Sequence, residues 1–487
     1  MRDSAGGSPS AGVASHIGNN LGYHGQGMNS SKPLFANQSA YSEIQPDEYF
    51  DPEIETLGGS AVRDLQQAKL SRQLDYLFAR SEFYRDKFRA AGLRREHIRS
   101  LRDLENCPFT TKEELRDSQA VCPPLGRHMG ADMASVIRIH ASTGTTGKPS
   151  FVGITRHDSE VWTRVTARSF YTQGIRPTDI VIHGASLALF AGGLPSKDAL
   201  ERIGATFVPV GTGASEKLVL VARTLGANAL HCTPSYAIYL VDFVRRETGL
   251  DPRELGIRKI VCGAEPGAGI PAVRARISEA FGARVTEGLG NADMVPIIFA
   301  ECRDQSGMHF NGQEYVYVEV IDPESGHNLP LESGVSGELV YTSLDRECVP
   351  LLRFRTRDRV TILDTSCACG RTSFKLRCVG RTDDMLIVLG VNVFPSAVRD
   401  VVSSFHPRTT GEIQILLDAP GPGVTPPLKI KAEFSDQSGD LAELRSALER
   451  KIKAVLNVSS QIELVPAGAL PRFEMKGQLT KKLDENS

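Results

Sequence analysis

Short apolar runs alternate with helix-like stretches between residues 130 and 345, and this alternation limits the chain to a small set of folds. The runs have the length and composition of strands, and the stretches between them have a helical apolar period. Strands that are separated by helices form parallel pairs, so the pattern predicts an α/β fold. The runs are "SVIRIHA", "DIVIHGA", "ATFVPV", "NALHCT" and "RKIVCGA", which begin at Ser135, Asp179, Ala205, Asn228 and Arg258.

The pattern changes near Gly380, where strand-like and helix-like segments follow the order β-α-β-β-α-β. This order is that of a ferredoxin-like α+β domain. We therefore predict a small C-terminal domain at residues 382–487, after a large domain at residues 45–381. The second helix, "DLAELRSALERKIKAVL", is amphipathic. Its apolar face contains Leu441, Leu444, Leu448, Ile452 and Val455.

Residues 1–44 are rich in Ser, Gly and Asn and poor in bulky apolar side chains. Such a segment cannot offset its ordering entropy by burial, so we predict a disordered tail, with a regulatory tail as the alternative. From residue 59 to residue 92 the apolar spacing is helical, and Gly92 ends the run.

The net charge of −2 and the 9 cysteines restrict the class of partner and the compartment. A nearly neutral chain lacks the basic surface that nucleic acid or an anionic membrane attracts, so we expect a small-molecule substrate. We find no apolar run of the roughly 20 residues that span a bilayer, and no secretory leader. An odd number of widely spaced cysteines favours a reducing, cytoplasmic compartment. The oligomeric state stays open, with a dimer as one outcome.

The loop "ASTGTTGKPS" at residues 141–150 combines glycines, hydroxyl side chains and one lysine. It is not a P-loop, because only two residues separate Gly144 from Gly147 where that motif needs four. Its chemistry still suits phosphates, since glycines expose backbone N–H groups and Lys148 supplies a cation. Taken alone, an ordinary turn is the alternative.

The surroundings of this loop resemble a known family. "HASTGTTGKPSFVGITRHD" is similar to the phosphate loop of adenylate-forming enzymes, in their phenylacetate–CoA ligase branch. Further segments match in the same order, from about residue 45 to residue 482. They are "LFAGGL" and "CTPSY" of the acyl pocket, "GAEPG" of the adenine site, "VPLLRFRTRDRV" of the ribose site, "GRTDDMLIVLGVNVFP" of the hinge and "LPRFEMKG" of the lysine loop.

The resemblance implies a large adenylate-forming domain with mixed sheets and helices and a small, mobile ferredoxin-like domain. It implies that ATP and a carboxylic acid form an acyl-adenylate, which a thiol then attacks. Bringing two anions together calls for positioning and cationic stabilisation, which suits Lys476 and Lys148 as catalytic residues. The implied nucleotide contacts are Ser142, Thr143, Gly144, Thr145, Thr146, Gly147, Lys148, Gly263, Ala264, Glu265, Pro266, Glu287, Gly288, Leu289, Gly290, Asn291, Asp358 and Arg381.

Alternatives remain for two of these residues. Lys476 could be a solvated lysine, and Asp358 could form a salt bridge with one of its arginine neighbours, Arg355, Arg357 or Arg359, instead of binding ribose. The resemblance further implies a hinge at Asp383, which lets the small domain rotate between the two half-reactions. A thiol tunnel would be lined by Gly390, Val391 and Asn392.

The segment "TEGLGNADMVP" departs from the residue pattern of the family. Glu287 occupies the position of an aromatic residue, and Asn291 that of a glutamate that helps to hold Mg²⁺. An amide oxygen is a weaker ligand for a hard cation than a carboxylate, so Asp293 or Glu287 is a candidate substitute.

The acyl pocket is expected to accept an aromatic acid, which stacks on small and aromatic surfaces. The segment "GASLALF" lacks the extra aromatic residues of arylacetate members, which hints at a substituted aryl acid. The implied pocket residues are Phe190, Ala191, Gly192, Tyr236, Gly263, Ala264 and Leu289.

Four residues of types that bind metal ions occur in two segments. "ECRDQSGMHF" contains Cys302 and His309, and "SCACGR" contains Cys367 and Cys369. Together they could form a tetrahedral Cys₃His site for structural Zn²⁺. Buried cysteines without a metal are the alternative.

Three functions are compatible with these residues. The first is an aryl-acid–CoA ligase that uses ATP, Mg²⁺ and CoA. The second delivers the same adenylate to the phosphopantetheine of an acyl carrier protein. The third is a degenerate nucleotide-binding protein, which the lost glutamate favours and which the retained Lys148, Asp358, Arg381 and Lys476 oppose.

Overall fold

The computed structural model describes residues 48–143, 149–382, 384–389, 391–418, 423–472 and 479–482. The predicted tail at residues 1–44 lies outside these ranges. So do several predicted site residues, namely Gly144, Thr145, Thr146, Gly147, Lys148, Asp383, Gly390 and Lys476. For Thr143 and Asn392 only the backbone is described.

Four helices begin the described part of the chain, and the apolar residues of two of them, α2 and α3, share a small core. The predicted helical run is present, but it is divided in two. Ser81 has the extended backbone angles φ −101° and ψ 112°, which end one helix and allow the next to start in a new direction. Ser81 is fully buried, so the break belongs to the core. The helices are α1 (Pro52–Glu55), α2 (Gly59–Arg80), α3 (Glu82–Ala90) and α4 (Lys112–Val121).

A sheet of 12 strands dominates the described residues, in the order β11-β10-β12-β13-β14-β9-β8-β7-β6-β5-β3-β4. The half from β4 to β7 is parallel, and the half from β8 to β11 is antiparallel. The parallel strands are β3 (Ile180–His183), β4 (Thr206–Pro209), β5 (Ala229–Cys232), β6 (Lys259–Cys262) and β7 (Arg284–Asn291). The others are β8 (Val295–Glu301), β9 (Met308–Phe310), β10 (Val316–Ile321), β11 (Asn328–Leu329), β12 (Ser336–Ser343), β13 (Phe354–Asp364) and β14 (Lys375–Arg381).

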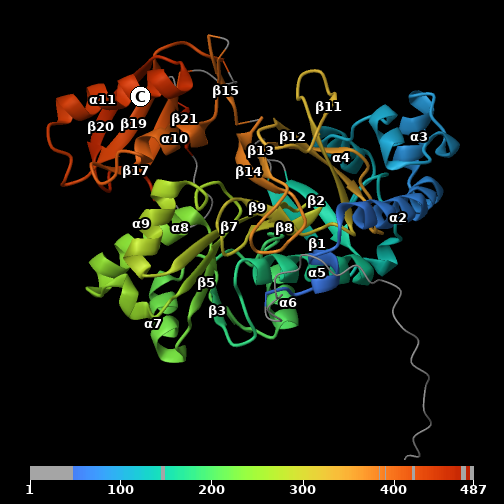
Figure 1. The fold of residues 1–487 in the computed structure, drawn as a ribbon, viewed down its shortest axis with the longest axis horizontal. Coiled ribbons are helices and arrows are strands. Elements are labelled where there is room, and N and C mark those ends of the chain that lie inside the picture. The colour runs from blue at the N-terminus through green and yellow to red at the C-terminus, as the bar shows by residue number, and fades with distance from the viewer. Residues whose placement is uncertain are drawn as a thin grey trace, which may run out of the picture. The chain divides into compact units, whose positions relative to one another are not determined.

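Helices cover both faces of the parallel half (Figure 1). Successive strand residues alternate between two cores, as the period of a strand requires. Ile182 and Leu230 pack under one set of helices, whereas Val181 and Ala229 pack under the other. This confirms the α/β prediction. The first set is α7 (Ser215–Leu225), α8 (Pro234–Phe243) and α9 (Pro271–Phe281), and the second is α5 (Arg156–Thr172) and α6 (Leu194–Ile203).

A hairpin of β1 (Arg138–Thr143) and β2 (Pro149–Ile154) holds both ends of the expected phosphate loop. The two strands pair antiparallel up to Thr143 and Pro149. The loop residues between them lie outside the described ranges.

The C-terminal segment contains the predicted order of strands and helices, with additional strands. The first strand, β15 (Leu386–Val388), pairs with β16 (Val391–Val393) and β18 (Gly423–Val424) in a small sheet. A sheet of four strands follows in the order β20-β19-β17-β21. Its strands are β17 (Thr409–Leu417), β19 (Leu428–Phe434), β20 (Ser460–Pro466) and β21 (Thr480–Lys482), and its helices are α10 (Pro395–Ser403) and α11 (Leu441–Leu456).

The apolar face of α11 is narrower than predicted. Leu444, Leu448 and Ile452 are fully buried, whereas Leu441 is 38% exposed and Val455 is 55% exposed. The two exposed residues lie in the first turn and the last turn of the helix.

No helix among the described residues is long and apolar enough to cross a bilayer.

We expect Leu448→Ala to destabilise the C-terminal segment by about 2–5 kcal/mol, because a fully buried leucine leaves a cavity that its neighbours fill only in part. Hydrogen exchange of peptides from β17 and β19 measures the effect. Leu441→Ala on the same helix is the control and should change little. Equal effects of the two changes would contradict the burial pattern described here.

Candidate active site and metal centre

The predicted nucleotide and acyl segments follow the carboxyl ends of the parallel strands, where open α/β sheets bind ligands. Residues 233–236 follow β5, and residues 263–267 follow β6. The two segments are tied together, because the backbone N–H of Ser235 donates to Glu265 Oε1 at 2.8 Å. Ala264 has a φ of 72°, an uncommon value for alanine that the surrounding contacts hold in place.

The acyl segment lies directly beside β1, the strand that leads into the phosphate loop. The backbone N–H of Ala141 on β1 donates to the carbonyl oxygen of Leu189 at 2.8 Å, and Ala141 pairs with Phe190. A Cβ at position 192 would lie 2.4 Å from the Phe190 ring, so a larger residue than Gly192 would force this ring to move. A predicted acyl residue is thus a neighbour of the strand that precedes the phosphate loop, although the two lie far apart in the sequence.

Tyr236 lies at the first turn of α8 and is fully buried. Its hydroxyl shares a hydrogen bond of 3.0 Å with Ser215 Oγ. Its ring packs against Gly184, where a Cβ would lie 3.1 Å from Cε1. Ser215 and Gly184 are therefore contacts of the predicted pocket residue that the sequence analysis did not name.

The predicted ribose residue, Asp358 on β13, lies opposite Arg381 on β14. Arg381 Nη1 is 3.2 Å from Asp358 Oδ1, and the aspartate is 6% exposed. Two of its three arginine neighbours have other partners: Arg355 pairs with Glu338 at 2.7 Å and Arg357 with Glu113 at 3.7 Å. The ion pair of Asp358 therefore joins two predicted nucleotide residues.

The two candidate substitutes for the lost magnesium ligand are engaged elsewhere. Glu287 accepts a hydrogen bond from the Gly267 backbone N–H at 3.0 Å. Asp293 Oδ2 pairs with Lys112 Nζ at 2.5 Å, while its buried Oδ1 has no partner among the described residues. The side chain of Asn291 caps the turn by accepting from the Met294 N–H at 2.9 Å. These described side chains do not form a ligand set for Mg²⁺.

The predicted metal ligands converge in space. The ligand atoms of Cys302, His309, Cys367 and Cys369 all lie within 4.8 Å of one another. Cys302 Sγ is 3.7 Å from Cys367 Sγ, and Cys369 Sγ is 3.4 Å from His309 Nε2. A tetrahedral Zn²⁺ site requires about 3.8 Å between two thiolates and about 3.5 Å between a thiolate and an imidazole nitrogen. The geometry therefore fits zinc.

The tautomer of His309 also suits a metal. His309 Nδ1 lies 3.3 Å from the Ser373 carbonyl oxygen, a contact that places the proton on Nδ1 and leaves Nε2 free as a ligand.

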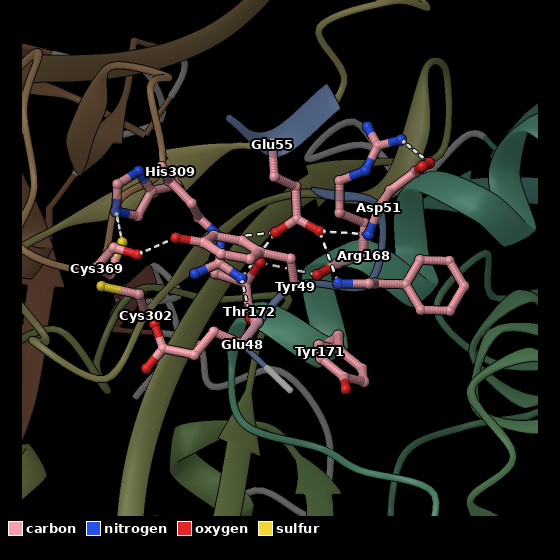
Figure 2. A network of polar contacts seen from close by, with 12 residues as sticks. Glu48, Tyr49, Asp51, Glu55, Arg168, Tyr171, Thr172, Cys302, His309 and Cys369 are labelled. Atoms are coloured by element: carbon pink, nitrogen blue, oxygen red, sulfur yellow. Dashed lines mark hydrogen bonds and ion pairs between the residues drawn. The ribbon is translucent and has the colours of Figure 1, made fainter. Parts of the chain in front are cut away.

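The loop that carries Cys367 and Cys369 is fastened to the first described residues of the chain (Figure 2). The Tyr49 hydroxyl donates to the Cys369 carbonyl oxygen at 2.7 Å. Arg371 pairs with the fully buried Glu55 at 2.7 Å. Residues 48–55, which we name the strap, therefore hold the cysteine loop through Tyr49 and Glu55.

The strap also meets helix α5. Asp51 pairs with Arg168 at 2.7 Å (Figure 2). Glu314 pairs with the same arginine at 2.7 Å, and the arginine side chain is fully buried. A buried guanidinium needs such partners, because an unpaired charge in the interior is costly. No spacing in the sequence indicates these contacts, since they join residues more than 100 positions apart.

Comparison with known proteins identifies the family. Residues 390–482 match the family model of the AMP-binding enzyme C-terminal domain. The phenylacetate-coenzyme A ligase of Thermus thermophilus is 35% identical over 453 residues, which cover 89% of this chain and 99% of the relative. The corresponding ligase of Escherichia coli is 33% identical and covers 88% of this chain and 95% of its own length.

This chain belongs to the phenylacetate–coenzyme A ligase family.

A solved structure supports the same assignment. This ligase-family chain matches a 2-hydroxyisobutyryl-CoA ligase, solved in the postadenylation state with 2-HIB-AMP, at a TM-score of 0.84 and 30% identity. The match covers 91% of this chain and 94% of that one. The family and the fold inferred from the sequence motifs are thereby confirmed. The roles of single residues remain predictions.

We expect the purified ligase-family chain to contain about one zinc ion per chain, and Cys369→Ser to lose it, because a structural site needs all four ligands. Metal analysis by mass spectrometry measures both. Cys122→Ser is the control, because this exposed cysteine lies outside the cluster. A wild-type zinc content far below one would instead indicate ordinary buried thiols.

Proposed function

We propose that the chain is an AMP-forming acid–thiol ligase that joins an aromatic carboxylic acid to CoA. The similarity to phenylacetate-coenzyme A ligases over as much as 99% of a relative's length carries this proposal. An acid–CoA ligase first forms an acyl-adenylate and pyrophosphate from the acid and ATP. The CoA thiol then displaces AMP.

In the first step, the loop from Ser142 to Lys148 would bind the β- and γ-phosphates, and Lys148 and Lys476 would neutralise the two reacting anions. Positioning and cationic stabilisation provide most of the catalysis when phosphoryl groups react. The proximity of Ala141 and Phe190 supports this arrangement, because it brings the acid beside the loop. Asp358 would accept hydrogen bonds from the ribose hydroxyls, with Arg381 at the same edge.

In the second step, a small domain at residues 382–487 would turn about Asp383 relative to the large domain at residues 45–381. Gly390, Val391 and Asn392 would then line the path of the thiol. This chain matches the solved 2-hydroxyisobutyryl-CoA ligase at a TM-score of 0.84 in the postadenylation state and 0.67 in the thioesterfication state. The two states of that relative therefore differ, which supports a rearrangement between half-reactions.

The proposed acid is a substituted aryl acid. The buried Tyr236 ring and the Phe190 ring supply aromatic surface, and the paired hydroxyls of Tyr236 and Ser215 could orient a polar substituent. Two alternatives deserve a direct test. One is a carrier-protein phosphopantetheine as acceptor, and the other is a small hydroxy acid, the type of acyl group bound by the solved relative.

The described residues provide a ligand set for one of the two proposed metal ions, Zn²⁺, and none for the other, Mg²⁺. Cys302, His309, Cys367 and Cys369 would hold a Zn²⁺ that fixes the loop and does no chemistry. Mg²⁺ would arrive with the phosphates of ATP, as is usual for this ion, since the described side chains near Asn291 do not provide its ligands. We place the protein in the cytoplasm, where its nine free cysteines stay reduced.

We expect ATP-dependent release of pyrophosphate with at least one acid from a panel of benzoic, aminobenzoic, arylacetic, cinnamic and 2-hydroxyisobutyric acids. Thioester formation is then measured with CoA and with a holo carrier protein in parallel, and we expect CoA to be preferred. No release with any acid would favour a degenerate nucleotide-binding protein.

Lys476→Ala should lower the rate of adenylation at least 100-fold, because the missing ammonium leaves two anions unscreened as they approach. ATP binding, followed by calorimetry, should change little. Lys482→Ala is the control, since this exposed lysine lies at the end of β21. A Lys476→Ala variant with the full adenylation rate would refute the proposed role.

A further inference from the structure

Glu287 lies where β7 changes its partner strand. Up to this residue β7 pairs in parallel with β6, where Cys262 faces Glu287. From the next residue, Gly288, it pairs antiparallel with Ala300 of β8. The side chain of Glu287 is 6% exposed and contacts residues 263–269, the segment that follows β6 and that we name the nucleotide loop.

Two glycines of the nucleotide loop converge on the Glu287 carboxylate. The backbone N–H of Gly267 donates to Oε1 at 3.0 Å, and the backbone N–H of Gly269 also bonds to the carboxylate. A Cβ at position 269 would lie 2.3 Å from Oε2, so only glycine allows this approach. Backbone N–H groups that point at one anion form a concave binding site, and here the protein supplies the anion itself.

Arg274 on α9 holds the same loop from a second direction. Its Nε donates to the carbonyl oxygen of Ala268 at 2.8 Å, between the two glycines. Its Nη2 pairs with both oxygens of Glu301, at 2.6 and 2.7 Å. Glu301 Oε2 in turn accepts from the backbone N–H of Glu287 at 2.9 Å. The contacts form a closed ring that runs from Glu287 through the loop, Arg274 and Glu301 back to Glu287.

Burying this ring costs free energy, because its charged groups are removed from water. Two carboxylates, each less than 7% exposed, lie in this ring, and only Glu301 is paired directly with the guanidinium of Arg274. Burial and then the neighbouring Glu301 raise the pKa of Glu287, and the backbone N–H groups of Gly269 and Gly267 oppose the rise. An apolar residue would avoid this cost, but it could not accept the glycine N–H groups that hold the nucleotide loop.

We propose that Glu287 is a positioning residue that fixes the nucleotide loop for ATP, in the place where the resemblance implies an aromatic side chain. The inference rests on the proposed function, since Gly263, Ala264, Glu265 and Pro266 are nucleotide contacts only if the chain binds ATP. Glu287 would act through the loop, since its described contacts are with the loop and with Glu301. It holds by hydrogen bonds a backbone whose strained Ala264 would otherwise relax.

Glu287→Gln tests the proposal by binding and by kinetics. The glutamine keeps one carbonyl oxygen for one glycine N–H but turns an NH₂ group toward the other, which leaves a buried donor unpaired. We expect the ATP dissociation constant and the ATP KM to rise about tenfold. The kcat at saturating ATP should stay within about threefold, because no group that touches the reacting atoms has changed.

Two further variants separate positioning from stability. Glu319→Gln is the matched control, because Glu319 is a buried carboxylate that is paired with Arg353, and burial raises its pKa too. This variant should lower the Tm without changing the ATP KM. Arg274→Lys leaves Glu287 in place but loses the two-oxygen contact with Glu301, and it should raise the ATP KM as Glu287→Gln does. If Glu287→Gln does not fold, the ATP KM of Arg274→Lys decides between a positioning role and a purely structural one.

The outcomes of this test and of the proposed function are distinct. If wild type binds ATP but releases no pyrophosphate, the proposed ligase activity fails, and the dissociation constants still decide the inference. If Glu287→Gln and Arg274→Lys lower the Tm like Glu319→Gln and leave ATP affinity unchanged, Glu287 is only structural and the inference is overturned. A wild-type chain that binds no ATP overturns both.

Discussion

The arrangement of the site depends on one strand that pairs in two ways. The first half of β7 continues the parallel sheet, and its second half starts the antiparallel sheet, so a single strand of eight residues joins the two halves. Only the parallel half needs crossover connections, so β7 and β8 are joined by a short turn. The nucleotide loop, the predicted acyl residue Leu289 and the turn at Asn291 all lie along or beside this strand. The position of the site therefore follows from backbone hydrogen bonding before any side chain is considered.

Ion pairs between buried side chains are the second recurring feature of the structure. Glu301 pairs with Arg274, Asp51 and Glu314 share Arg168, and Glu55 pairs with Arg371. The last two sets join elements that lie far apart in the sequence, and the first joins α9 to β8. Ion pairs of this kind add little net stability, because desolvation offsets their attraction. They do penalise any misaligned packing, since a shift would leave a charge unpaired in the interior.

Much of the architecture and part of the site could be predicted from the sequence. Alternating runs reveal parallel strands because burial on both faces makes those strands continuously apolar. The pairing of Cys302 and His309 with Cys367 and Cys369 was predictable because few residue types bind zinc. Helix ends were less predictable: the break at Ser81 and the exposure of Leu441 and Val455 depend on what packs against each turn.

Two parts of the site could not be predicted from the spacing of residues in the sequence. Tyr49 and Arg371 act through partners more than 300 positions away, so no local pattern marks them. Glu287 appeared in the sequence only as a departure from a family pattern. Its contacts are seen only in the structure. There the strand register pairs Glu287 with Cys262, and its carboxylate lies against Gly269 of the nucleotide loop.

The strap has a consequence for the order of events during synthesis. Glu55 leaves the ribosome 316 residues before Arg371, the partner that neutralises it in the interior. Until that arginine and the cysteines beside it have emerged, Tyr49 and Glu55 lack the partners that hold them in the folded chain. The strap can therefore complete its contacts only after most of the large sheet has been synthesised.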